Sequence, residues 1–334
     1  MKIDAALPAQ ASGFALACPR DRAPLRAGPA GTLCCPACGA AYPVVNGVPV
    51  LLNDSASVFA TADYLAGTGY AGPSYGGAAD TARGPRLLWR RLARRLGQAR
   101  TSLVHPGPAD AIAHVAALRP QPRVLVIGAG EARLDAAARI LFTDVAFGPD
   151  VAVIADAHDL PFPDASFDLV IAVAVLEHVA DPQRCVAEIG RVLDAGGHVF
   201  ADTPFLQPVH MGAYDFTRFT PIGHRRLFRH FDEIAAGISM GSGSALAWTL
   251  GGALLSVSAW RPWQLAARML GLLVTPPLRW LDRWLAGSGD AAGGCWFFGR
   301  ARGALGPVPD RVLVDNYRAG FGRGPRTLPP PGAA

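Results

Sequence analysis

Short apolar runs alternate with longer mixed stretches through the middle of the chain, and most of these runs end in glycine or a polar residue. Five of them follow one another between Arg123 and Phe205: RVLVIGAG, RILFTDV, VAVIAD, FDLVIAVAV and HVFADTPF. Runs of this length that are rich in β-branched residues, with helix-compatible stretches between most of them, predict buried strands. The pattern therefore predicts an α/β fold with a doubly wound, mostly parallel, Rossmann-like sheet.

The segments on either side of this sheet divide the chain further. Residues 1–53 are turn-rich and cysteine-bearing, which predicts a small module, and residues 54–85 form a Gly/Ala/Ser-rich linker. The main domain is expected over 86–302, opening with the helix-patterned RLLWRRLARRLGQARTSLV. A Trp-rich helical insertion is expected over 244–292, and 303–334 are expected to be a disordered tail.

Composition narrows the class of protein. A chain of 334 residues that is 51% hydrophobic and 17% charged is long enough for one full α/β domain and a smaller one. A net charge of +5 is mild for this length, so no nucleic-acid partner is predicted. The first residues lack a sustained apolar core, which predicts no signal peptide and a cytoplasmic protein. Composition leaves the oligomeric state open.

The predicted strand ends carry the candidate chemistry, because ligands of such sheets bind at the carboxyl edge. The first strand ends in Gly128 and Gly130, but Glu131 and Arg133 follow where a dinucleotide-binding turn keeps small residues. A cofactor without phosphates, such as S-adenosylmethionine, would tolerate them. Asp144 would then serve the ribose hydroxyls, and Asp156 the adenine amino group.

Three longer motifs carry a family resemblance. VLVIGAG, ADAHDLPFPDASFDLVIAVAVLEHVADP and EIGRVLDAGGHVFADTPF occur in order and at the usual intervals. They resemble the motifs of class I S-adenosylmethionine-dependent methyltransferases of the type 11 group. The resemblance implies a seven-stranded sheet, with FDEIAAGISM and CWFFGRAR as its last two strands. It also implies these cofactor-binding residues: Gly128, Ala129, Gly130, Asp144, Asp156, Ala157, Leu176 and Glu177.

The resemblance implies a methyltransferase that acts on a small-molecule, glycan or lipid-linked acceptor. Val126, Glu131 and Asp21 favour an alternative, a non-catalytic partner protein with a vestigial cofactor site that binds another macromolecule. Two departures from the family motifs also predict weaker cofactor binding. Val126 stands where the family usually has an acidic residue, and the stretch from Gly130 to Asp144 is short for a full first helix.

The N-terminal module has cysteines at metal-binding spacing. Cys35-Pro-Ala-Cys38-Gly is a zinc knuckle, and Cys18 begins a second pair whose partner position is Asp21. The segment resembles the zinc-ribbon module that activates some methyltransferases. Structural zinc bound by Cys18, Asp21, Cys35 and Cys38 is one interpretation, with Cys34 as an alternative fourth ligand. A metal-free ribbon and a redox pair are the others.

The segment TPFLQPVHMGAYDFTRFT follows the fifth predicted strand and is placed to border the reacting methyl group. It resembles a pattern found in a subgroup of these methyltransferases. We expect His210 to act as the base, with His178 as the next candidate. Asp215 is a further catalytic-site candidate, although an ion pair with Arg218 that fixes the loop is its more favoured role.

Residues 244–287 interleave tryptophan and arginine with apolar residues. A helical cap over the mouth of the active site is the favoured interpretation. The composition also suits peripheral contact with a membrane interface, which would make the protein membrane-associated.

Overall fold

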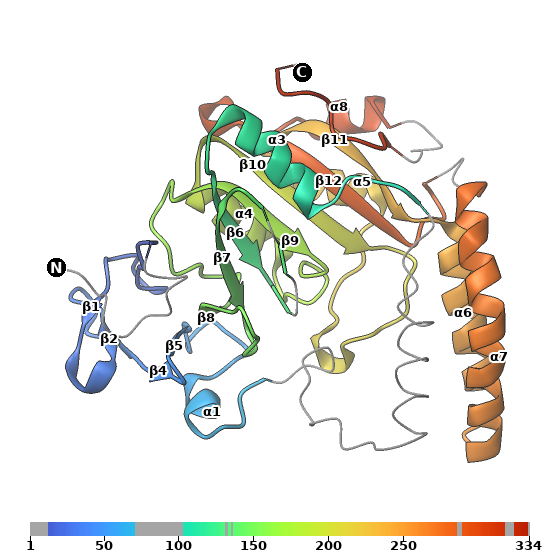
Figure 1. The fold of residues 1–334 in the computed structure, drawn as a ribbon, viewed down its shortest axis with the longest axis horizontal. Helices are drawn as coiled ribbons and strands as arrows, with labels where there is room; N and C mark the ends of the chain where they lie inside the picture. Colours follow the sequence, from blue (N-terminus) through green and yellow to red (C-terminus); the bar gives the residue numbers. More distant parts are fainter. Residues whose placement is uncertain are drawn as a thin grey trace.

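The computed structural model describes residues 13–70, 103–130, 133–134, 136–285, 289–317 and 324–332. Its centre is a nine-stranded sheet in the order β11-β12-β10-β9-β6-β7-β8-β5-β4 (Figure 1). The seven expected strands are all present: β6 (Arg123–Ile127), β7 (Arg139–Asp144), β8 (Val153–Ala155), β9 (Phe167–Val173), β10 (Leu193–Pro204), β11 (Phe231–Met240) and β12 (Gly294–Ala301). The pairs from β10 to β8 are parallel, and β12 is antiparallel to both β10 and β11. The predicted fold class is confirmed.

Two further strands of this sheet come from the N-terminal module. β4 (Val44–Val45) and β5 (Val48–Leu51) form a hairpin whose turn residues, Asn46 and Gly47, both have positive φ. Asn-Gly is the residue pair that a tight two-residue hairpin turn favours. β5 then pairs in parallel with β8, so that Val50 lies opposite Ile154. The end of the module is thus built into the edge of the large sheet.

The rest of the module packs on one face of that sheet. Its own small sheet comprises β1 (Arg26–Ala27), β2 (Leu33–Cys34) and β3 (Ala41–Tyr42), with a 3-10 turn at Pro29–Gly31. Phe14 stacks on Phe167 of β9 with ring centroids 5.4 Å apart. Leu16 and Leu33 belong to the same buried cluster as β9. Apolar burial therefore joins the module to the larger domain.

Helices cover the two faces of the sheet unevenly. On one face α3 (Pro108–Leu118) buries Ile112 and Val115 in a cluster with residues of β6, β9 and β12. On the other, α4 (Pro182–Val192) and α5 (Pro221–Leu227) cover β9, β10 and β12. α4 begins at an N-cap, where the Asp181 side chain accepts a hydrogen bond from the Arg184 amide. The described residues between β6 and β7 contain no helix, as the short spacing there indicated.

The insertion between β11 and β12 forms a helical hairpin. α6 (Ser242–Ser256) and α7 (Arg261–Trp280) lie side by side and project from one end of the sheet, followed by the 3-10 turn Leu281–Arg283 (Figure 1). Among the described helices, none is long and apolar enough to cross a membrane.

The linker and the tail differ from expectation in the residues that the structure describes. α1 (Thr61–Leu65) lies in the predicted linker and buries Tyr64. In the tail, expected to be disordered, the 3-10 turn Gly303–Leu305 and α8 (Asp310–Asp315) are formed. Asp310 accepts hydrogen bonds from Arg226, and Leu328 packs on the core, which explains why these parts are ordered. All but the last two residues of the helix predicted over 86–104 lie outside the described residues.

Leu51 tests whether the module and the sheet share one core, because its side chain is fully buried in β5. We expect Leu51→Ala to lower the free energy of unfolding by about 2–4 kcal/mol, the usual cost of a cavity at such a site. Leu65→Ala is the matched control, since Leu65 is 64% exposed, and it should change the value by less than about 0.5 kcal/mol. Urea unfolding followed by circular dichroism measures both. Equal, small effects would contradict a shared core.

Candidate functional site

A cavity of about 340 Å³ opens at the carboxyl ends of the parallel strands. Strand ends, the connector after the N-terminal module and the loop after β10 all contribute to it. Its lining includes Phe59, Tyr70, Gly128, Gly130, Asp144, Asp156, Ala157, His158, Val175, His178, His210 and Tyr214. The cavity therefore lies at the edge where the sequence placed a ligand site.

The glycine turn after β6 has a conformation that demands glycine. Gly128 and Gly130 have φ values of +63° and +56°. A Cβ on Gly128 would also lie 2.4 Å from Cγ2 of Val175. The turn thus brings bare backbone to the cavity wall. Without a helix in the described residues that follow, it offers no helix N-terminus for a pyrophosphate.

Asp144 is held at the end of β7 by two backbone amides. Oδ2 accepts the Gly130 amide at 2.8 Å, and Oδ1 accepts the Ala146 amide at 2.9 Å. Its side chain is buried and lines the cavity. These two bonds orient the carboxylate at the wall of the cavity.

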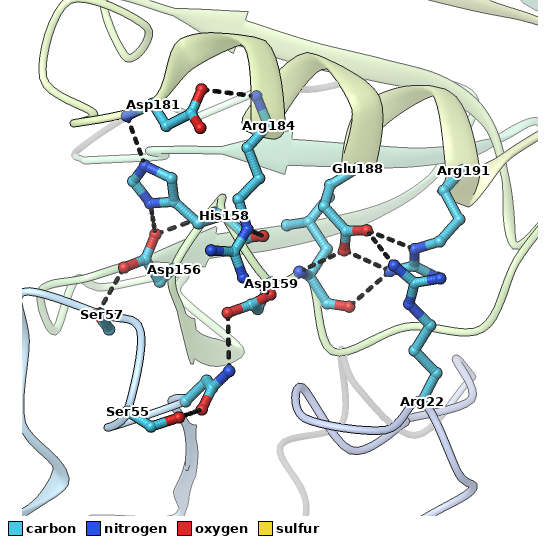
Figure 2. A network of polar contacts seen from close by, with 12 residues as sticks. Arg22, Ser55, Ser57, Asp156, His158, Asp159, Asp181, Arg184, Glu188 and Arg191 are labelled. Carbon is cyan, nitrogen blue, oxygen red and sulfur yellow. Dashed lines mark hydrogen bonds and ion pairs between the residues drawn. The ribbon is translucent and has the colours of Figure 1, made fainter.

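Asp156, at the end of β8, is the centre of a polar network (Figure 2). Its Oδ1 accepts the His158 amide at 3.0 Å and lies 2.5 Å from Nδ1 of the same histidine. The amide of Asp181 donates to Nε2 of His158, so the neutral ring carries its proton on Nδ1. Burial acts to raise the pKa of Asp156, but the hydrogen bonds and field of His158 outweigh it and the pKa lies below its ordinary value.

The N-terminal segment completes this network. Ser57 donates to Oδ2 of Asp156 at 2.5 Å, and Asn53 donates to Asp159 at 3.0 Å. Farther along, Arg22 donates to Glu188 of α4 at 3.1 Å (Figure 2). The segment that follows the module therefore reaches the cavity through Ser57, which bonds directly to Asp156.

Three aromatic rings from distant segments meet at the cavity. Phe59 stacks on Tyr214 with centroids 5.5 Å apart, and Tyr70 contacts both rings edge-on. Sequence reasoning treated residues 54–85 as a linker and missed this wall. The available signal was the set of large aromatic residues, among them Tyr64, in a stretch otherwise rich in Gly, Ala and Ser.

Glu177, His178 and His210 meet beside the cavity. Nε2 of His178 lies 3.0 Å from Nε2 of His210, and Oε1 of Glu177 lies 3.6 Å and 3.9 Å from these two nitrogens. Glu177 is fully buried, and burial raises its pKa to about 8. Burial also lowers the pKa values of both histidines, which keeps the imidazoles neutral near pH 7.

Asp215 and Arg218 form the ion pair that was favoured for them, and this pair fixes the loop after β10. Asp215 also accepts the His210 amide at 2.9 Å. Burial opposes ionisation of Asp215, but Arg218 outweighs it and the pKa falls to about 2. The turn Gly212–Tyr214 is held from the other side, because the carbonyl of Glu177 accepts the Phe216 amide. Asp215 therefore positions His210 rather than facing the cavity.

The predicted site residues are not all at the cavity. Leu176 is fully buried in the apolar core, and Ala129, Leu176, Glu177 and Asp215 are absent from the cavity lining. The expectation that residues 244–287 cap the cavity is also wrong, because none of the described residues in this range lines the cavity. The α6–α7 hairpin projects away from the sheet because its own helices pack on each other, with Asp282 anchoring Ser244 at its base.

The N-terminal module brings Cys18, Asp21, Cys35 and Cys38 together, with all ligand atoms within 4.8 Å of one another. Sγ of Cys18 and Sγ of Cys38 are 3.7 Å apart, close to the roughly 3.8 Å that tetrahedral zinc with bonds of about 2.3 Å would impose. Asp21 oxygens lie 3.2 Å and 3.3 Å from Sγ of Cys35. The Ala23 amide donates to Asp21, which lowers its pKa to about 2 and keeps it ionised. The donor set fits structural zinc.

Two alternatives for the module are weaker. Cys34 lies apart from the cluster, against Thr32 and beside Gly28, so it does not replace Asp21. All six cysteines are free, and a separation of 3.7 Å between two sulfurs is far from the roughly 2.05 Å of a disulfide.

Comparison with protein families gives two matches. Residues 110–201 match the model of a methyltransferase domain, and residues 15–47 match the model of Trm112p-like proteins. The first span contains the cavity's glycine turn and both carboxylates, and the second contains the Cys18 to Cys38 cluster.

Curated relatives match over short segments. The ubiquinone/menaquinone biosynthesis C-methyltransferase UbiE of Psychromonas ingrahamii is 39% identical over 20% of this chain and 28% of its own. The phosphatidylethanolamine N-methyltransferase of Cereibacter sphaeroides is 46% identical over 13% of this chain and 22% of its own. The chain therefore spans less than a third of these two relatives.

Solved structures match over longer spans at low identity. A possible histamine N-methyltransferase of Thermotoga maritima is 16% identical, with a TM-score of 0.37, over 65% of this chain and 97% of its own. A complex of the Haloferax volcanii Trm112 methyltransferase activator with a methyltransferase gives 18% identity and a TM-score of 0.35 over 66% of this chain and 99% of the matched chain.

The metal cluster yields a prediction about ligand type. Thiolate holds zinc more tightly than carboxylate in such sites, so Asp21→Cys should release zinc to a chelator more slowly than the wild-type module. Cys38→Ala should release it faster, and Cys34→Ser should leave the rate unchanged. A chromogenic chelator records the release. Equal rates for all four proteins would contradict zinc binding at this cluster.

Proposed function

We infer that this chain, which carries a methyltransferase domain behind a Trm112p-like module, is an S-adenosylmethionine-dependent methyltransferase. One observation carries the proposal: bare glycine backbone and two oriented carboxylates, Asp144 and Asp156, surround one cavity that lacks a phosphate site among its described residues. That combination suits a nucleoside with an amino-acid tail.

We propose these roles for the cofactor-side residues. Asp144 would hold the ribose hydroxyls, because two backbone amides fix its carboxylate at the cavity wall and a carboxylate accepts hydrogen bonds from hydroxyls. Asp156 and Ala157 would flank the adenine, with Ser57 of the segment after the module fixing the Asp156 carboxylate. Gly128 and Gly130 would let the amino-acid end approach the backbone. S-Adenosylmethionine supplies a methyl group on a cationic sulfur, so the donor needs no activation by the protein.

The acceptor side is assigned to His178 and His210. Both line the cavity, and both are neutral near pH 7, so either imidazole can accept a proton from a hydroxyl or amine. His210 is the more accessible of the two, and the Asp215–Arg218 pair holds its loop in place. We propose that His178 and His210 align the acceptor and take up its proton.

A lipid-linked acceptor is favoured by the α6–α7 hairpin. Its surface exposes large apolar side chains, with Val257 and Trp260 both 68% exposed and Leu273 73% exposed. No acidic residue occurs from 242 to 281, whereas Arg261 and Arg268 are exposed there. Apolar side chains beside unopposed arginines suit the interface of an anionic membrane. The names of two relatives, which refer to quinone biosynthesis and to phosphatidylethanolamine, point the same way.

Asp144→Ala tests the cofactor site. Loss of hydrogen bonds to a carboxylate should weaken S-adenosylhomocysteine binding by about 1.5–3 kcal/mol in calorimetry. Asp150→Ala is the control, because Asp150 lies in the connection after β7 and pairs with Arg133 outside the cavity. Incubation with methyl-labelled S-adenosylmethionine and a lipid extract then tests transfer. A wild-type protein that binds no S-adenosylhomocysteine would favour the vestigial, non-catalytic alternative.

The hairpin predicts binding to anionic vesicles. Each arginine near such a surface contributes about 1 kcal/mol, so replacing Arg261 and Arg268 together by Gln should weaken vesicle binding by roughly 10-fold or more. Trp260→Ala should weaken vesicle binding as well. Leu305→Ala is the control and should leave vesicle binding unchanged, because Leu305 is exposed but lies outside the hairpin. Sedimentation with phosphatidylglycerol vesicles measures the partition. Equal sedimentation of all variants would refute the membrane contact.

A further inference from the structure

We propose that Glu177, His178 and His210 bind a divalent transition-metal cation on the acceptor side of the cavity. One ligand atom from each lies within 4.8 Å of the others. The set contains no sulfur and belongs to the methyltransferase domain, so it is distinct from the cluster in the N-terminal module. The proposal rests on the proposed function and changes one role in it, because His178 and His210 would hold a cation beside the acceptor instead of accepting the acceptor's proton themselves.

Glu177 provides the first reason. Its carboxylate is fully buried, and within the described part of the chain no other residue donates a hydrogen bond to its oxygens. A buried carboxylate without a partner is costly. The negative charges of Asp202 and Asp215 act on it unfavourably, and the Arg218 charge offsets them only in part. A cation next to Glu177 would supply the missing partner.

The imidazole of His178 provides the second reason. Nδ1 of His178 lies 2.8 Å from the carbonyl oxygen of Tyr214, which can only accept, so this nitrogen carries the proton. The lone pair of the neutral ring is then on Nε2, directed toward His210 and Glu177. A backbone carbonyl that fixes the tautomer in this way is the usual second partner of a metal-binding histidine.

Distances agree with two adjacent ligands of one ion. The two Nε2 atoms are 3.0 Å apart, and bonds of about 2.1 Å at a right angle would place ligand atoms about 3.0 Å apart. A hydrogen bond from His210 to His178 would account for this one distance. It would still leave both oxygens of Glu177 unpaired, whereas a shared cation accounts for all three side chains.

The donor set indicates the class of cation. Two imidazoles with one carboxylate suit Mn²⁺, Fe²⁺, Co²⁺ or Zn²⁺, while Mg²⁺ and Ca²⁺ prefer oxygen ligands. Three protein ligands leave positions open for an acceptor. In the loaded protein, a hydroxyl acceptor beside the cation would lose its proton more readily, and the imidazoles would act through the metal rather than as the base.

Calorimetric titration with MnCl₂ tests the site in full-length protein that has first received one equivalent of zinc, which the thiolates of the N-terminal module take up in preference and which Mn²⁺ does not displace from them. We expect one equivalent to bind to the wild-type protein. Glu177→Gln, which keeps the shape of the side chain, and His210→Ala, on a half-exposed loop, should each weaken binding by about 10-fold or more. His230→Ala removes an exposed histidine outside the cluster and should bind as the wild type does.

The outcomes separate this inference from the proposed function. Saturable binding that is lost in Glu177→Gln and His210→Ala but kept in His230→Ala supports the metal site. Absence of saturable Mn²⁺ binding, or equal affinity in all four proteins, overturns it. S-Adenosylhomocysteine titrated into the same samples reports on the cofactor site by itself, so a protein that binds this ligand and no Mn²⁺ retains the proposed function without the metal.

Discussion

The parallel pairing of β5 with β8 is the contact on which the site's geometry depends. β8 is only three residues long, and it ends immediately before Asp156. Without β5 it would be the edge strand of the sheet, with its outer backbone groups unpaired. The pairing closes that edge, and the chain that leaves β5 continues directly to Ser57 and Phe59. One backbone ladder therefore stabilises the strand, orients a carboxylate and places one wall of the cavity.

The polar network around α4 extends this constraint across the surface of the sheet. Arg191 donates hydrogen bonds to both carboxylate oxygens of Glu188 and also to the carbonyls of Leu160 and Phe162. Oε2 of Glu188 also accepts the amide of Leu160, and Oε1 accepts a hydrogen bond from Arg22 of the module. The buried carboxylate of Glu188 is thus matched by several donors, as a low-dielectric interior requires. The motifs that resemble the methyltransferase family therefore include residues that build this scaffold, such as Glu188 and Arg191, as well as residues that face the cavity, such as Asp156.

Much of this arrangement could be predicted from the sequence, because its signals are local. The seven strands are continuous apolar runs, and Cys35 to Cys38 is a short motif that the turn itself brings together. The pairing of β5 with β8 could not be predicted, because a parallel ladder between segments a hundred residues apart leaves no periodic trace. The same holds for the aromatic wall, where Phe59 and Tyr214 meet only in the folded chain.

Two other expectations failed for reasons that composition cannot resolve. The α6–α7 segment was expected to cap the cavity, yet its two helices pack on each other and Asp282 anchors the hairpin base by accepting hydrogen bonds from Gly241 and Ser244. The tail was expected to be disordered because it is rich in proline and glycine, yet a few contacts, such as Arg226 with Asp310, order part of it. In both cases sparse tertiary contacts override local composition.

The hydrogen bond from Ser57 to Asp156 has a consequence for regulation. It joins the segment that follows a module suited to a structural metal with a carboxylate of the cavity, so zinc and the proposed cofactor would be thermodynamically linked. By reciprocity, whatever factor zinc adds to cofactor affinity is the factor that the cofactor adds to zinc affinity. A chain of this design would report metal supply as a change in its apparent affinity for a small molecule, with no separate sensor protein.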